Sequence, residues 1–236
     1  VVPIPTITAN ASPVAICPGS SSTLTATGAT SYTWNPGGLS GTPVTVTPTI
    51  TTTYTLIGSS GGCSTNTTVI VTVNPTPTLT ATASPTAICP GGSSTLSATG
   101  GVSYTWNPGG LSGSPVTVSP LVNTTYTLIG TNALGCSATK TVAVIINPSP
   151  TITVSASTPS ICAGSSAVLT ASGAVTYSWN PGGLSGTSVT VTPIVTTTYT
   201  VTGTNLTGCT GQKTITIIVV PIPTITANAS PVAICP

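Results

Sequence analysis

The sequence predicts an all-β protein made of small two-sheet sandwiches in tandem. Two observations carry this prediction. A unit of about 73 residues recurs along the 236-residue chain. Within each unit, short runs rich in Val, Ile, Thr and Tyr are interrupted every eight to twelve residues or so by Gly, Pro, Asn or Ser, as is typical of short strands joined by turns. No stretch has the apolar period of a helix.

The cysteines mark the repeat. Equivalent cysteines are 72, 73 and 73 residues apart, and residues 219–236 copy residues 1–18 letter for letter, so the sequence starts over after 218 residues. We therefore expect either a far longer native protein or copies that join end to end. The predicted divisions are 1–74, 75–147 and 148–220 for three repeats, and 221–236 for the start of a fourth that is identical to the start of the first.

Six or seven short strands in about 72 residues fit a compact sandwich of the immunoglobulin type. A β-solenoid would need a much shorter period. In the second repeat we expect strands near 78–83, 93–99, 102–107, 115–119, 124–130 and 138–146.

Every aromatic side chain occupies one of two repeated positions, a Tyr-x-Trp and a Thr-rich Tyr. Both rings of Tyr-x-Trp share one face of a strand, because side chains alternate. We expect the Trp to fill the core beside a disulfide, since the chain has no Phe or Met. The alternative is an exposed aromatic platform for sugar rings. The expected core aromatics are Trp34, Trp106, Trp179, Tyr54, Tyr126 and Tyr199.

Each repeat holds two cysteines, 46 or 47 residues apart, which we interpret as one disulfide within each repeat. A zinc or redox site would need C-x-x-C spacing or His partners, and neither exists. Such disulfides place the protein outside the cell, at the cell surface. The expected pairs are Cys17 with Cys63, Cys89 with Cys136, and Cys162 with Cys209, and Cys235 would continue into the next unit.

The composition excludes most chemistry. Lys140 and Lys213 are the only charged side chains, and there is no Asp, Glu or His. General acid–base groups and carboxylate metal ligands therefore cannot be assembled, and we expect no enzyme, no cofactor and no metal. A net charge of +2 gives no basic patch for nucleic acid. No run reaches the ~20 apolar residues of a membrane-inserted helix.

The connections and the surface suggest an assembly. A Pro-x-Pro step stiffens each short linker, and an almost uncharged surface offers little repulsion between molecules, so we expect a semi-rigid array that self-associates laterally or end to end. The linker prolines are Pro75, Pro77, Pro148, Pro150, Pro221 and Pro223.

The order of motifs carries a resemblance across all three repeats: YTWNPGGLSG, a PVTV or SVTV strand, TTTYTLIG, and a Cys-led last strand ending in VTVNP. It resembles the PKD-type, immunoglobulin-like repeats of giant secreted Bacteroidota surface proteins. The resemblance implies an adhesin, a stalk or a gliding-associated filament exported by the type IX pathway. Where such repeats commonly carry acidic residues, this chain has Asn132 and Asn205, which argues against calcium-rigidified linkers.

Three functions follow from these features. The leading prediction is a structural array that forms the shaft of a long extracellular filament or surface appendage, with itself as partner. The alternative is an adhesin module that binds glycans or surfaces through Tyr, Thr or Asn side chains. A third candidate, ice binding by Thr-x-Thr steps, needs a flat face that a twisted sandwich does not supply.

Overall fold

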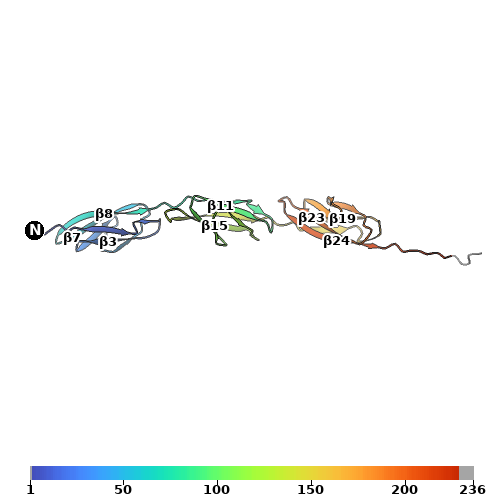
Figure 1. Cartoon of the computed structure of the whole chain (residues 1–236), viewed down its shortest axis with the longest axis horizontal. Coiled ribbons are helices and arrows are strands. Elements are labelled where there is room, and N and C mark those ends of the chain that lie inside the picture. Colours follow the sequence, from blue (N-terminus) through green and yellow to red (C-terminus); the bar gives the residue numbers. More distant parts are fainter. Residues whose placement is uncertain (1, 229–236) are drawn as a thin grey trace, which may run out of the picture. The chain divides into compact units, whose positions relative to one another are not determined.

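The computed structural model describes residues 2–228 and confirms the all-β class. The described residues form strands, turns and irregular segments (Figure 1). In this part of the chain no helix is long and apolar enough to span a membrane.

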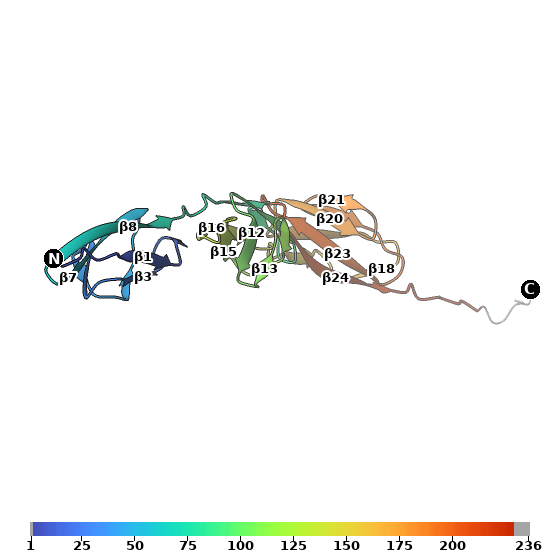
Figure 2. The ribbon, with the colours of Figure 1, turned by 60° about the vertical axis from the view of Figure 1, so that its left-hand side comes forward.

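The first repeat forms two sheets, of three and five strands (Figure 2). The smaller sheet has the order β1 (Thr8–Ser12), β3 (Ser22–Thr27), β6 (Val44–Val46). The larger has the order β2 (Ala15–Ile16), β8 (Cys63–Val73), β7 (Thr52–Ser60), β4 (Ser31–Asn35), β5 (Leu39–Ser40).

The second and third repeats have the same two sheets in the same order. In the second repeat the sheets are β9 (Thr80–Ser84), β11 (Ser94–Thr99), β14 (Val116–Val118), and β10 (Ala87–Ile88), β16 (Ser137–Ile146), β15 (Thr124–Thr131), β12 (Ser103–Asn107), β13 (Leu111–Ser112). In the third they are β17 (Thr153–Ala156), β19 (Ala167–Ser172), β22 (Ser188–Val191), and β18 (Ser160–Cys162), β24 (Thr210–Val220), β23 (Thr197–Thr204), β20 (Thr176–Asn180), β21 (Leu184–Ser185).

One pairing is parallel in each repeat, and it positions the site described below. After β1 the chain crosses to the other sheet, where β2 runs parallel to the end of β8, with Ala15 opposite Thr72 and Ile16 opposite Val73. All other strand pairs of the first repeat are antiparallel. Because β2 pairs with the last residues of β8, the residue that follows β2 lies beside the point where the chain leaves the repeat.

Each core is built around a tryptophan. Trp34 is fully buried in a cluster with Leu24, Leu56 and Val71. Its indole Nε1 donates a hydrogen bond of 3.0 Å to the carbonyl of Gly41, so the buried polar atom has a partner. Trp106 and Trp179 are buried in the same way, and their indoles donate to the carbonyls of Gly113 and Gly186. The clusters around Trp34 and Trp179 contain no cysteine, so these tryptophans pack without a disulfide.

The tyrosines complete the same cores. Tyr54, Tyr126 and Tyr199 are buried. The hydroxyl of Tyr32 donates to the carbonyl of Ala29 and accepts from its amide, each at 2.8 Å. Tyr104 and Tyr177 make the same pair of hydrogen bonds with Gly101 and Ala174. None of the nine aromatic rings, which all lie in the described part of the chain, is exposed, so no aromatic platform exists there.

The compact units of the chain do not coincide with the repeats. One unit comprises the residues up to Thr86 together with Ser93–Val118 and Asn123–Val144. The other comprises Ala87–Gly92, Ser119–Val122 and the residues from Ile145 onward. The repeat boundaries at residues 74, 147 and 220 remain a prediction, and the second half of the predicted fourth repeat, 229–236, lies outside the described residues.

Candidate functional site at the repeat junctions

The first junction is organised by one asparagine. Asn132 lies in the turn between β15 and β16, and its Nδ2 donates a hydrogen bond of 2.8 Å to the carbonyl of Pro75 in the linker. Its Oδ1 accepts hydrogen bonds of 3.0 Å from the amides of Leu134 and Cys136. One side chain therefore closes its own turn and holds the linker that arrives from the preceding repeat.

A disulfide lies at the same junction. Cys136, which is fully buried, is bonded to Cys17 of the first repeat, 119 residues earlier, with a Cα–Cα distance of 5.4 Å. The Sγ of Cys136 also lies 3.8 Å from the carbonyl oxygen of Asn74, the first residue of the linker. The end of one repeat and the start of the next are thus joined by the backbone and by a disulfide.

The predicted pairing of cysteines within each repeat is wrong. Cys17 directly follows β2, whose Ile16 pairs with Val73 at the end of β8, whereas Cys63 is the first residue of β8. The strand has 11 residues, so at ~3.3 Å per residue its two ends lie about 33 Å apart. A disulfide requires Cα atoms within about 7 Å. The two cysteines of a repeat therefore lie at opposite ends of one strand.

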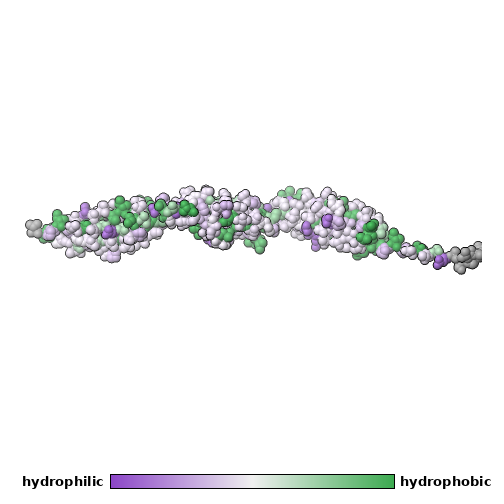
Figure 3. All heavy atoms as spheres, viewed as in Figure 1, coloured by the Kyte–Doolittle hydropathy of each residue, from purple (hydrophilic) through white to green (hydrophobic). Residues whose placement is uncertain are grey.

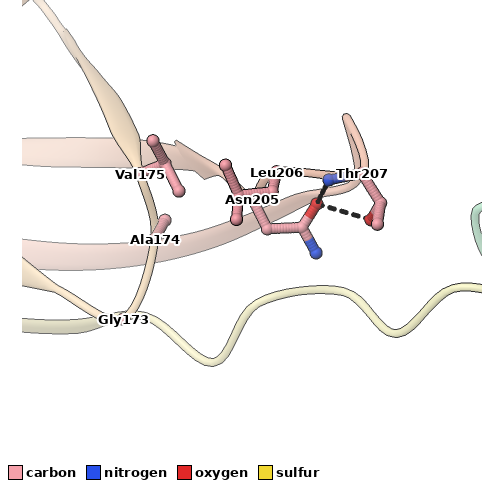
Figure 4. Close-up of a pocket in the computed structure, with 6 residues that line it drawn as sticks. All are labelled: Gly173, Ala174, Val175, Asn205, Leu206 and Thr207. Atoms are coloured by element: carbon pink, nitrogen blue, oxygen red, sulfur yellow. Dashed lines mark hydrogen bonds between the residues drawn. The ribbon is translucent and has the colours of Figure 1, made fainter.

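The second junction has the same kind of disulfide and the same asparagine contacts as the first. Cys89 is bonded to Cys209, 120 residues later. Asn205 Nδ2 donates to the carbonyl of Pro148 at 2.9 Å, and Oδ1 accepts from the amide of Cys209 at 2.9 Å. The amide and hydroxyl of Thr207 also donate to Oδ1, as the dashed lines of Figure 4 show. Asn132 and Asn205 thus hold the linkers by direct hydrogen bonds.

The linker prolines have two different environments. Pro75 and Pro148 are exposed and offer their carbonyls to the junction asparagines. Pro77 and Pro150 are half-buried. Pro221 and Pro223 follow β24 and are exposed.

The remaining cysteines have no disulfide partner among the described residues. Cys63 is half-buried and Cys162 is exposed. Cys235 lies outside the described residues. No group of three or more His, Cys, Asp or Glu residues gathers within residues 2–228.

A hollow of about 390 Å³ lies beside the second junction (Figure 4). Val175 and Leu206 line it with exposed apolar side chains. Asn205 is its one amide side chain, and both its Oδ1 and its Nδ2 already have hydrogen-bond partners. No charged or titratable group lines the hollow. It therefore offers shape but little polar chemistry for recognition of a sugar.

Comparisons with known proteins give matches of low identity and low TM-score among solved structures. No family model and no curated protein matches the chain. Among solved structures, a Ca²⁺-stabilised adhesin with which an Antarctic bacterium binds ice is 16% identical, with 94% of this chain and 75% of that chain covered and a TM-score of 0.36. A three-immunoglobulin fragment of titin, I67–I69, is 12% identical, with 89% and 95% covered and a TM-score of 0.35. At this level of similarity they do not bear on what this chain binds.

Proposed function

We propose that this chain is a segment of the shaft of an extracellular filament or surface appendage, and that its repeats serve as structural units. One observation carries the proposal: at both junctions in the described residues, a disulfide accompanies the backbone connection. A spacer that only separates two binding domains needs the backbone alone. Covalent reinforcement between neighbouring repeats suits an array whose continuity is its function.

Two further features support the proposal: the disulfides, which favour a place outside the cell, and a surface with little charge, which favours association. Disulfides persist in oxidising compartments, and one lies at each of the two junctions in the described residues. The surface in Figure 3 is mostly of intermediate hydropathy, with apolar patches scattered over it. Exposed apolar side chains such as Ile50, Leu121 and Ile194 recur in the same loop of each repeat. With two charged side chains in the whole sequence, little repulsion opposes association between neighbouring molecules.

We also propose that the chain is related to secreted Bacteroidota repeat proteins. This part of the proposal rests on the motif order alone. The adhesin alternative has less support, because every aromatic ring in the described residues is buried or half-buried and no charged or titratable group lines the hollow at Asn205. A glycan array probed with the oxidised protein separates the two functions. We expect no glycan to bind above background.

Electron microscopy of native, unreduced material tests the proposal directly. We expect continuous fibres with an axial repeat of three domains, roughly 100 Å if each domain contributes about 35 Å. Discrete short rods in native material, together with a specific glycan hit, would overturn the filament in favour of an adhesin arm.

A further inference from the structure

We infer that Cys63 and Cys162 form a third disulfide of the same kind, which joins one copy of the three-repeat unit to the next. Cys162 of the preceding copy would bond to Cys63 of the following copy. This inference rests on the proposed function in one respect, that copies of the unit follow one another. Its evidence is the equivalence of both cysteines to the bonded cysteines at the two junctions.

Cys63 occupies the place that Cys136 and Cys209 occupy in their repeats. Its Sγ lies 3.6 Å from the carbonyl oxygen of Val2, the residue equivalent to Asn74 and Asn147. The corresponding distances are 3.8 Å for Cys136 to Asn74 and 3.7 Å for Cys209 to Asn147. The thiol of Cys63 is therefore held beside the incoming chain as in the bonded repeats, and by the same rule its partner would belong to a preceding repeat.

Cys162 occupies the place of Cys17 and Cys89. It ends β18, which runs parallel to the end of β24, as β2 does to β8 and β10 to β16. Cys17 and Cys89 are half-buried in their disulfides, whereas the Cys162 side chain is exposed. Cys162 is thus presented where the chain leaves the third repeat, with no partner in the described residues.

The spacing of the sequence agrees with this pairing. The two disulfides join residues 119 and 120 positions apart. The sequence starts over after 218 residues, so in a continuous array the next equivalent of Cys63 falls 119 residues after Cys162. The same rule, first cysteine of one repeat with second cysteine of the following repeat, then accounts for every cysteine of the unit.

Formation of the bond is a two-electron oxidation. The two thiols lose two protons and two electrons, and an external disulfide such as oxidised glutathione takes them up. The thiolate of one cysteine attacks this oxidant and releases one reduced thiol, and the second cysteine then displaces the other. The products are one protein disulfide and two small-molecule thiols.

The test uses the full chain with oxidised glutathione and non-reducing electrophoresis. Wild type is expected to give a ladder of linked copies, and C63S or C162S alone is expected to lose at least nine-tenths of it. A mixture of C63S and C162S should give a linked dimer, because each variant supplies one of the two thiols. C235S is the matched control and should keep the ladder. Tryptophan emission confirms that each variant is folded.

Peptide mapping identifies the bond itself. Cleavage after Lys, Leu, Tyr and Trp places Cys63 alone on peptide 57–79 and Cys162 alone on peptide 141–169. We expect these two peptides to be linked in oxidised material and separate after reduction. Cys63 and Cys162 recovered as free thiols from the oxidised ladder, or a ladder that depends on Cys235 alone, would overturn the inference.

The same map of native fibres separates this inference from the proposed function. Fibres that lack the linked peptides would overturn the disulfide and leave the filament intact. Linked copies without fibres would retain the disulfide and overturn the filament. Reduction of denatured native fibres then shows whether neighbouring copies are separate chains, which fall apart into single units, or one continuous chain, which stays long.

Discussion

A single amide side chain performs two tasks at each junction. Asn132 accepts hydrogen bonds from two amides of its own turn and donates one to the linker carbonyl of Pro75. Both halves of the amide are needed, because the oxygen caps the turn and the nitrogen holds the linker. An aspartate in its place would keep the acceptor and lose the donor.

Replacement of this amide therefore has a graded effect. We expect Asn132→Ala to reduce the free energy of unfolding by about 1–3 kcal/mol through loss of three hydrogen bonds, and Asn132→Asp to cost less because its oxygen still caps the turn. Asn66→Ala, on the exposed face of β8, should change it by less than about 0.5 kcal/mol. Urea unfolding measures all three. Equal losses for Asn132→Asp and Asn132→Ala would show that the oxygen contributes nothing.

One glycine is required by a close approach of two chain segments. Gly100 has a φ of +96°, and a Cβ there would collide with the backbone carbonyl of Thr78. Gly110 has a φ of +59° with open space around it. Both alanine variants incur the strain of positive φ, ~1 kcal/mol, but only Gly100→Ala adds a backbone collision. We expect Gly100→Ala to be the more destabilising by at least about 2 kcal/mol in chemical unfolding. Similar losses would mean that the carbonyl moves away at little cost.

Most strands of the second repeat can be predicted from the sequence, and the shortest ones cannot. Six of the eight strands of the second repeat, including β11, β15 and β16, follow from runs of Val, Ile, Thr and Tyr between turn residues. The burial of Trp106 follows from the same alternation. β10 and β13 have two residues each, too few to show any alternation.

One of these two short strands, β10, positions the disulfide of the second junction. The parallel pairing of β10 with the end of β16 carries Cys89 to the exit of its repeat, as β2 does for Cys17. The regular spacing of the two cysteines within each repeat favours a disulfide inside that repeat. Spacing does not show, however, where each cysteine lies along the last strand. The spacings of 119 and 120 residues between neighbouring repeats are as regular as the 46 and 47 within one, so spacing alone does not choose between the two pairings.

Cleavage at one lysine distinguishes the two connectivities. Lys140 lies on β16, and trypsin cuts after it and after Lys213. In urea, with free thiols alkylated, we expect residues 1–213 to remain one species without reductant, because Cys89–Cys209 spans the cut after Lys140. Reduction should release fragments 1–140 and 141–213. Pairing within repeats would separate them without reductant, and Lys140→Gln is the uncut control.

Over the whole molecule, stability should depend on pH at the alkaline end alone. The chain has no Asp, Glu or His, so almost nothing changes protonation between about pH 4 and 8. Burial raises the pKa of Tyr54, Tyr126 and Tyr199 above the ordinary value of 10.0. The folded state therefore holds these protons more tightly than the unfolded state. This stabilisation is complete below pH 10 and is lost as the pH rises through the folded-state pKa values.

Thermal unfolding of the oxidised protein measures this profile. We expect the Tm to vary by no more than a few degrees from pH 4 to 8 and to fall steadily above about pH 10. Tyr126→Phe should weaken the alkaline fall by removing one of the three groups, provided that the variant is folded at pH 7. An acid transition between pH 4 and 6 would contradict the argument.

The two disulfides between neighbouring repeats also determine how the chain would extend under a pulling force. The shortest covalent route enters at Cys17, passes to Cys136, runs backward along the chain to Cys89, and passes to Cys209. Only the 47 residue-to-residue steps from Cys89 to Cys136 lie on this route, out of the 192 steps from Cys17 to Cys209. At ~3.5 Å per residue the unfolded oxidised segment could lengthen to about 170 Å, against roughly 670 Å after reduction. The two Pro-x-Pro linkers lie outside this route, so tension on the oxidised chain would pass through residues 89–136 and would bypass the linkers.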